Sequence, residues 1–147
     1  MRRRELFRAA LASTAVATML SQKEAQAQDA SARAARGMPM PKIKDIKVIE
    51  CAPKGSRLSV VKITTDQDGL YGYGCATFTQ RADLVKPAVE LYLKPLLVGR
   101  TVDRIEDIWQ MSYDSSYWKN GPVENNAISG VDQALWDIKG RMAGMPV

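Results

Sequence analysis

The order of the hydrophobic patterns constrains the fold more than any other feature of this sequence, because strand-like segments come first and helix-like segments follow. Alternating and β-branched patterns predict three strands, over residues 42–51, 58–65 and 71–77. Pro53 and Gly55 mark the first link, and Gly69 supplies a positive φ for a hairpin turn in the second. Links this short predict an antiparallel three-stranded meander, with one irregularity in the first strand where the alternation breaks.

Helical periodicity dominates the rest of the chain. Apolar residues that recur at three- and four-residue steps predict helices over 83–94, 104–110 and 124–143. Pro87 has to lie in the first turn of the first helix or kink it. Asp103 is positioned to cap the second helix, and Gly144 to end the third. Strands followed by helices predict an α+β domain, a three-stranded meander followed by a helical bundle.

The N-terminus has the pattern of an export signal. Basic residues at 2–4 precede an apolar run over 9–20, and residues 25–27 form a small-residue cleavage site. Residues 3–8 resemble the twin-arginine pattern, so we expect residues 1–27 to direct export, to the periplasm. The alternatives are an uncleaved membrane anchor and a disordered basic tail, but the apolar run is shorter than the roughly 20 residues of a spanning helix.

Composition sets the remaining domain boundaries. Residues 28–41 are rich in Ala, Ser and Arg and predict a flexible lead-in to a domain over 42–147. The 147 residues are too few for an eight-stranded β/α barrel, which needs about 250, so we expect the barrel to be absent. Residues 1–27 hold five basic and two acidic residues, which is +3 of the net +5. The other basic residues are interleaved with acidic ones, and this pattern argues against nucleic-acid binding.

The residues by themselves predict no catalytic constellation. The chain contains no His, which excludes His-based triads and His metal motifs. The G-x-G at 72–74 lacks the third Gly and the following helix of a dinucleotide site, so close packing in a strand is the better interpretation. Asp132 and Asp137 point in different directions on one predicted helix. They are interpreted as surface charges near Lys139 or Arg141.

Cysteines and aromatic residues leave two further questions. Cys51 and Cys75 end the first and third predicted strands with a strand between them, so we expect them not to form a disulfide. Several aromatic residues either form a sugar-stacking surface or belong to the core or an interface. They are Trp109, Tyr113, Tyr117 and Trp118.

The C-terminal stretch carries a family resemblance. Residues 127–141 read Ala-Ile-Ser-Gly-Val-Asp-Gln-Ala-Leu-Trp-Asp-Ile-Lys-Gly-Arg, which resembles the mandelate racemase/muconate lactonizing enzyme family, a branch of the enolase superfamily. Residues 74–81, 104–109 and 117–123 resemble sugar-acid dehydratases, in particular mannonate dehydratase-like, or starvation-sensing, proteins. The resemblance covers residues 42–147 and implies the family's N-terminal capping domain, a three-stranded meander followed by helices.

The resemblance also implies where the chemistry of the parent family lies. There, a β/α barrel that follows the cap carries three acidic Mg²⁺ ligands and the acid–base residues. Mg²⁺ stabilises the enediolate formed when the proton α to a carboxylate is removed, and water is then lost. Because this chain has no barrel, the resemblance implies no catalytic residue, no metal ligand and no Mg²⁺ bound by this chain.

Two cap loops carry the candidate substrate-binding residues. In the family, loops that match residues 52–57 and 77–81 close over the substrate. The resemblance therefore implies that Thr79, Gln80 and Arg81 face a sugar acid. Some mannonate dehydratases have Asn at the position of Thr79, and this departure weakens the case for mannonate. The alternative is that Thr79 caps its loop by bonding a nearby backbone N–H.

Two functions follow from this sequence. In the first, the chain is the cap of an exported, Mg²⁺-dependent sugar-acid dehydratase. It is inactive alone, binds a sugar acid only together with a barrel, and belongs to a parent enzyme that can form a homo-oligomer. The break inside a family motif at residue 147 favours this function. The alternative is a free-standing exported binding or assembly module without enzyme activity, and with no membrane anchor once the signal is removed.

Overall fold

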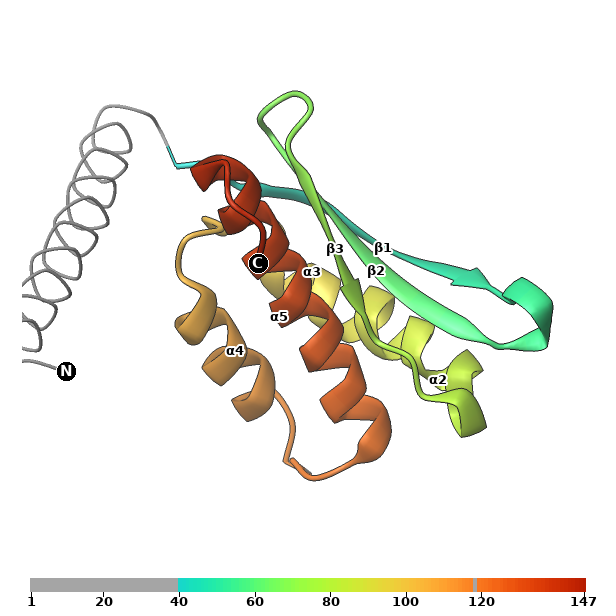
Figure 1. The fold of residues 1–147 in the computed structure, drawn as a ribbon. Coiled ribbons are helices and arrows are strands. Elements are labelled where there is room, and N and C mark those ends of the chain that lie inside the picture. The colour runs from blue at the N-terminus through green and yellow to red at the C-terminus, as the bar shows by residue number, and fades with distance from the viewer. Residues whose placement is uncertain (1–39, 118) are drawn as a thin grey trace, which may run out of the picture. The chain divides into compact units, whose positions relative to one another are not determined.

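The computed structural model describes residues 40–117 and 119–147, so the predicted export signal lies outside the described residues, as does nearly all of the lead-in. Three strands form the sheet: β1 (Ile43–Cys51), β2 (Leu58–Thr65) and β3 (Tyr71–Cys75). Both strand pairs are antiparallel in the order β1-β2-β3, which confirms the meander (Figure 1). The predicted irregularity is a register shift between Ile43 and Asp45. β3 is two residues shorter than predicted.

The first predicted helix is longer and less regular than its sequence pattern indicates. It consists of α2 (Ala82–Pro87), a π-helical segment η3 (Ala88–Leu93) and α3 (Lys94–Leu97). Pro87 ends α2, so it does not lie in a first turn, and the helix continues past it with wider turns. A proline has no N–H to donate and clashes with the carbonyl four residues back. The π-helical turns after Pro87 let the helix continue without that bond.

The other two helices differ from the prediction at their ends. α4 (Ile105–Asp114) begins after Arg104, and no side chain caps it, so the predicted Asp103 cap is wrong. Arg104 forms an ion pair with Asp107 in the first turn instead. α5 (Pro122–Ala143) begins two residues early, since proline's missing N–H costs nothing at the first position. Gly144 ends α5 with a φ of 67°, as predicted.

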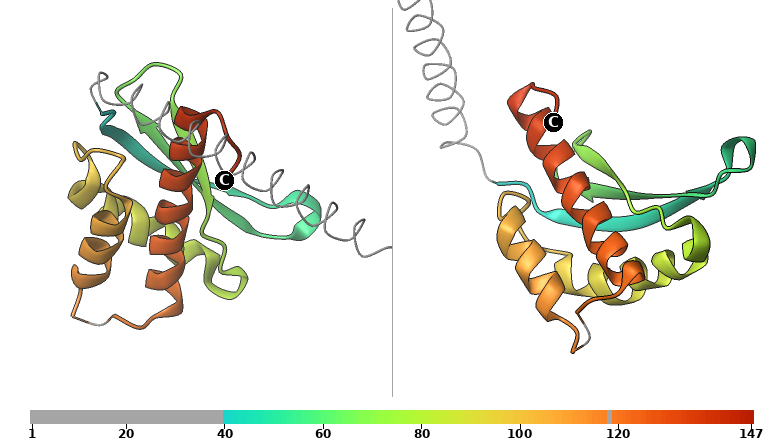
Figure 2. Two further views of the ribbon diagram at one scale, coloured as in Figure 1. Left: turned by 60° about the vertical axis from the view of Figure 1, so that its left-hand side comes forward. Right: turned by 60° about the horizontal axis from the view of Figure 1, so that its bottom comes forward.

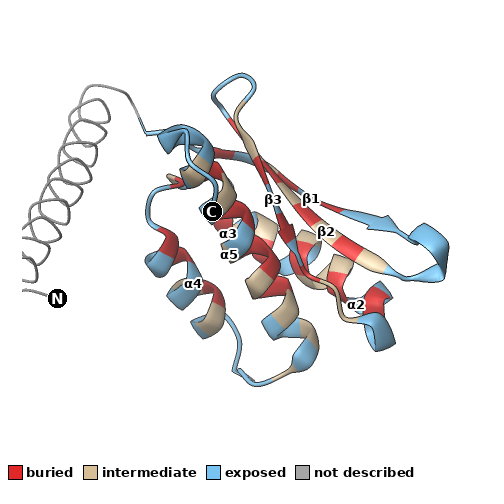
Figure 3. Cartoon of the chain, in the orientation of Figure 1, coloured by how far each residue is buried: buried red, intermediate tan, exposed pale blue. Residues whose placement is uncertain are grey.

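The helices gather on one side of the sheet, as Figures 1 and 2 show. α5 packs on β3 and β2, α4 packs on α5, and η3 packs on β1. Alternate residues of β2 are buried, and Figure 3 shows buried residues along the sheet and α5. The core includes Ile46, Val61, Ile63, Val85, Val89, Leu97, Ile105, Ile108, Val131, Leu135 and Ile138. In the described part of the chain, no helix is long and apolar enough to cross a membrane.

Glycines bring α5 unusually close to β3. A Cβ added to Gly72 would overlap the carbonyl of Ala134, and one added to Gly74 would overlap the carbonyl of Gly130. A Cβ on Gly130 would itself lie 2.6 Å from the Cβ of Ala76. The G-x-G is therefore a packing motif, as interpreted from the sequence.

The close packing of α5 on β3 also provides hydrogen-bond acceptors for backbone N–H groups at the free edge of the sheet. The backbone N–H of Tyr73 donates to Oδ2 of Asp137 at 2.9 Å, and that of Cys75 donates to Oε1 of Gln133 at 3.1 Å. Two residues of a strand span about 6.6 Å and four residues of a helix about 6 Å, so the two spacings match. Asp137 also accepts a hydrogen bond from Nε of Arg141 at 3.1 Å, the i,i+4 pairing expected of a surface charge.

Candidate functional site

The two candidate loops lie at the same end of the sheet. One connects the end of β1 to the start of β2, and the other follows the end of β3. In an antiparallel meander, the end of the first strand, the start of the second and the end of the third lie at the same end of the sheet. Figure 1 shows the first loop at the right-hand end of the sheet and the second loop below it, leading into α2.

The first loop is a tight exposed turn over residues 52–57. Its centre is the 3₁₀ turn Pro53–Gly55, closed by the Ser56 N–H, which donates to the Pro53 carbonyl at 3.1 Å. Lys54 and Gly55 have positive φ values of 52° and 85°. A lysine with positive φ is uncommon, because a Cβ disfavours this region. The turn therefore holds Lys54 outward at the tip of the loop.

The second loop brings the three predicted substrate-binding residues together. Thr79, Gln80 and Arg81 form a single 3₁₀ turn, and all three are exposed. The Arg81 N–H donates to the Phe78 carbonyl at 3.0 Å, and the Arg81 guanidinium donates to the Gln80 carbonyl at the same distance. The turn thus presents an amide, a hydroxyl and a guanidinium to solvent.

Thr77, and not Thr79, accepts a hydrogen bond from a nearby backbone N–H, which is the role that the alternative interpretation gave to Thr79. Oγ1 of Thr77 accepts the N–H of Ser59 at 3.1 Å, whereas no side chain caps the turn at Thr79. The Ala76 N–H donates to the Ser59 carbonyl at 2.9 Å and completes the junction. Loop capping therefore belongs to Thr77, and the Thr79 hydroxyl is not used to cap this turn.

An ion pair that the sequence did not reveal joins the first loop to α2, the helix that follows the second loop. The guanidinium of Arg57, at the end of the first loop, lies 3.1 Å from Oδ2 of Asp83, in the first turn of α2. Lys86 lies 3.9 Å from Glu50 beside it. Asp83 reads as an ordinary first-turn acid in the sequence. Its partner is 26 residues away, so only the folded chain shows the pair.

A hollow of about 260 Å³ lies beneath this pair. It is lined by residues of β1, β2 and the start of α2, including Glu50, Arg57 and Asp83. Ser59 also lines it, and the Ser59 Oγ is buried without a hydrogen-bond partner. Buried hydroxyls are normally satisfied by protein or water. The hollow therefore places charged groups of both signs next to the two loops, while the Ser59 hydroxyl is buried.

The other candidates do not add chemistry to this end of the sheet. Cys51 and Cys75 are free, as expected, and β2 lies between their strands. Trp109 and Tyr113 stack on each other on α4, with ring centroids 5.2 Å apart, while Trp118 lies outside the described residues. Across residues 40–117 and 119–147, no three His, Cys, Asp or Glu side chains are placed to share a metal ion. These residues can bind and position a ligand, but they include no such metal cage.

Comparison with known proteins identifies the family of this domain. Residues 36–147 match the model of the mandelate racemase/muconate lactonizing enzyme N-terminal domain. A D-galactonate dehydratase family member from Enterococcus gallinarum is 59% identical over 105 residues, 71% of this chain and 26% of that protein. One from Enterocloster bolteae is 61% identical over 105 residues, with the same coverage.

Solved structures give the same result. An enolase from Pantoea ananatis, solved with bound D-gluconate and Mg, has a TM-score of 0.69 and 57% identity over 70% of this chain and 25% of that one. A member of the enolase superfamily from Salmonella Typhimurium has a TM-score of 0.62 and 30% identity, covering 69% of this chain and 26% of that one. The chain spans about a quarter of the length of these relatives. It belongs to the mandelate racemase/muconate lactonizing enzyme family of the enolase superfamily and contains that family's N-terminal domain.

Proposed function

We propose that residues 42–147 are the substrate-closing cap of a sugar-acid dehydratase. The observation that carries this proposal is the convergence of two exposed loops, 52–57 and 77–81, at one end of the sheet, where the Arg57–Asp83 ion pair ties the first loop to the helix after the second. Relatives named as D-galactonate dehydratase family members match over this region, and a similar structure holds D-gluconate. An aldonate with its carboxylate and row of hydroxyls is the substrate class that suits these loops.

In this proposal the second loop contacts the substrate directly. Arg81 supplies a guanidinium for a carboxylate or hydroxyl oxygen, and Gln80 supplies an amide that both donates and accepts. Thr79 adds a hydroxyl. The Arg57–Asp83 pair positions the first loop against the second and does not itself touch substrate. Closing both loops over the ligand excludes water and orients the reacting carbon.

The described residues do not fit a Mg²⁺ site. Mg²⁺ prefers near-octahedral oxygen coordination, and this part of the chain groups no three metal-ligating side chains. We therefore assign substrate positioning to this chain, and metal binding and proton transfer to the remainder of a full-length enzyme. The parent enzyme's assembly as a homo-oligomer belongs to the same proposal.

Export is part of the proposal as well. Residues 1–27 combine paired arginines, an apolar run and a small-residue cleavage site, which are typical of a twin-arginine signal. We propose that the mature protein acts in the periplasm. Expression with a periplasmic and a cytoplasmic marker, followed by fractionation, tests this. Retention in the cytoplasm with an intact N-terminus would refute it.

A chimera tests the cap function. Residues 42–147 of this chain replace the matching quarter of the Pantoea ananatis enolase, and dehydration is measured with D-gluconate, D-galactonate and D-mannonate. We expect turnover of at least one aldonate, because the loops that close over the substrate are then supplied by this chain. We expect Arg81→Met in the chimera to raise KM about tenfold or more, because a charge-assisted bond to the substrate is lost.

The matched control is Arg104→Met, which removes another exposed arginine, the residue before α4 that pairs with Asp107. It should leave KM unchanged. A folded chimera that turns over none of the three aldonates would contradict the proposed substrate class. Equal effects of Arg81→Met and Arg104→Met would contradict the role of the second loop.

A further inference from the structure

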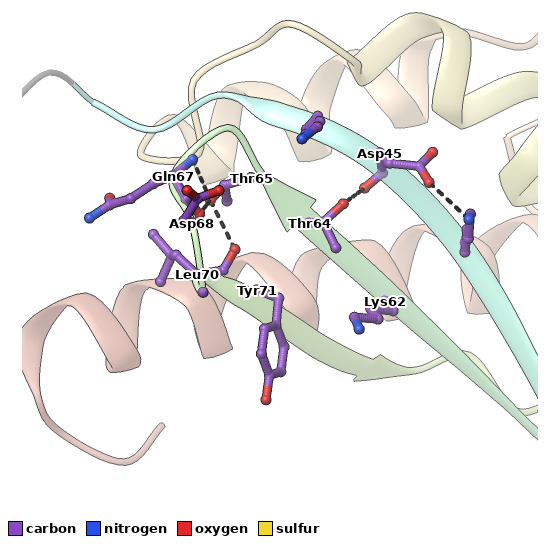
Figure 4. A pocket seen from close by; sticks show the side chains of 11 residues that line it. Asp45, Lys62, Thr64, Thr65, Gln67, Asp68, Leu70 and Tyr71 are labelled. Atoms are coloured by element: carbon purple, nitrogen blue, oxygen red, sulfur yellow. Dashed lines mark hydrogen bonds and ion pairs between the residues drawn. The ribbon is translucent and has the colours of Figure 1, made fainter.

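A second hollow lies at the opposite end of the sheet from the two loops, beside the β2–β3 hairpin. Figure 4 shows it, with side chains from β2, the hairpin and the start of β3 around it. Its volume is about 370 Å³. We call it the lysine hollow and define it by Lys44, Lys47, Lys62, Thr64, Gln67 and Tyr71.

The strand register places two of these lysines directly opposite each other. Lys47 of β1 pairs with Lys62 of β2, and both side chains lie on the sheet face away from the helix-packed core. Like charges directly opposite on neighbouring strands are destabilising. Lys44, exposed at the register shift of β1, adds a third positive charge. The fold therefore concentrates positive charge where sheet packing alone would avoid it.

The carboxylates nearby neutralise only part of this charge. Asp45 lies 3.5 Å from Lys47, but its shorter contact is 2.6 Å to Lys94, which comes from the adjoining helix. Asp68 also lines the hollow, from the exposed hairpin turn. Within the described part of the chain, Lys62 forms no ion pair with a carboxylate.

Aromatic rings hold the Lys62 ammonium group in place. It lies 4.8 Å from the ring centroid of Tyr71 and 5.7 Å from that of Tyr73, and the two rings contact each other edge to face. Arg141 lies over the Tyr71 ring at 4.7 Å and is anchored by Asp137. Cation–π contacts position a charge without neutralising it. Lys62 therefore keeps its net charge in a defined place.

We propose that the lysine hollow binds a small oxyanion, with a phosphate group as the ligand that fits best. A doubly charged phosphate would bridge Lys47 and Lys62 and relieve their repulsion. Phosphate gains more than a single carboxylate here, because the hollow holds three lysines against two carboxylates, one of which is engaged by Lys94. This site is separate from the cap loops and does not depend on their function.

An NMR titration of the full chain with inorganic phosphate tests the site, because it separates the hollow from the basic N-terminus residue by residue. We expect saturable amide shifts at Lys62, Thr64 and Tyr71, and not with sodium chloride at equal ionic strength. Lys62→Met should weaken binding at least fivefold, since it keeps the side-chain stem and removes the charge. Lys47→Met should do the same, and provides a second variant if the first misfolds.

The matched control is Lys139→Met. Lys139 also lies over an aromatic ring, 4.7 Å from the centroid of Trp136, but on α5 and outside the hollow. This variant should bind phosphate as the parent chain does. D-gluconate, with one charge, should bind at the same residues at least fivefold more weakly. Shifts that do not saturate, that spread equally to Lys139, or that survive both hollow variants would overturn the proposal, as would gluconate binding as tightly as phosphate.

Discussion

Two regions of the domain are held together in different ways: the seam, where α5 packs on β3, and the loop end of the sheet, which carries residues 52–57 and 77–81. At the seam, backbones meet directly through Gly72, Gly74 and Gly130, and little freedom remains. At the loop end, exposed 3₁₀ turns are joined by one ion pair between long side chains. The contrast separates the part of the domain that supplies stability from the part that can change to suit a ligand.

The sharpest way to break this contrast is to add one methyl group to the seam. Gly74→Ala should lower the free energy of unfolding by about 3 kcal/mol, because the new Cβ overlaps backbone atoms that cannot move aside. Urea denaturation measures the change. Gly55→Ala in the first loop, where the added atom meets nothing within 4 Å, is the control and should cost about 1 kcal/mol through its positive φ. Equal losses for both variants would show that the seam is not specially packed.

The next prediction concerns the side chains that cap the free edge of β3. Asp137→Ala should cost about 1–2 kcal/mol and speed hydrogen exchange at the Tyr73 amide, because that N–H loses its acceptor. Gln133→Ala should cost about 1 kcal/mol and act on the Cys75 amide instead. Each variant is the control for the other, measured by NMR-detected exchange. Acceleration of both amides by either change would contradict the residue-by-residue pairing.

A pH titration measures how much the ion pair between Asp45 of β1 and Lys94 of α3 contributes to stability, for comparison with the seam. The hydrogen bond from Lys94 lowers the pKa of Asp45 below its usual 3.8, against a smaller opposing effect of burial. A carboxylate with a lowered pKa stabilises the fold above its unfolded pKa and loses that contribution as the pH falls through its folded pKa. Asp45→Asn should therefore cost about 1 kcal/mol at pH 7. Thermal melts from pH 7 to pH 2 should show this difference vanish on acidification, and a constant difference would contradict it.

The smallest effect on stability is expected at the loop ion pair. Arg57→Met should change the free energy of unfolding by less than about 0.5 kcal/mol, because the pair is exposed to solvent. In the chimeric enzyme the same change should raise KM by about threefold, since the first loop is no longer held against the second. A stability loss near that of Gly74→Ala would instead make the loops part of the rigid core.

The strand and helix order was predictable because it follows from local periodicity. Alternation in β2 and three- and four-residue spacing in α5 each mark one buried face, and both elements are present within two residues of the predicted ends. Helix ends were harder to predict. Pro87 is tolerated inside a long helix because the π-helical turns after it are wider, and Arg104, not Asp103, directly precedes α4.

The predicted site residues were recognised by resemblance, and the structure adds how they are held. Thr79, Gln80 and Arg81 are neighbours in sequence, so their proximity needed no fold. The Arg57–Asp83 pair and the opposition of Lys47 to Lys62 join residues far apart in the chain. Only strand register and helix packing bring these groups together, and one sequence carries no direct record of either.

The amino-acid sequence alone determined the class of this domain, the meander-then-helix order and the family to which it is similar, because hydrophobic period and short motifs are local properties. The tertiary structure decided which turn faces solvent, which edge amides are capped and where charge accumulates. These depend on distances between residues 15 to 64 positions apart. Such distances are set by strand register and by the close approach of α5 to the glycines of β3, and both exist only when the chain is folded.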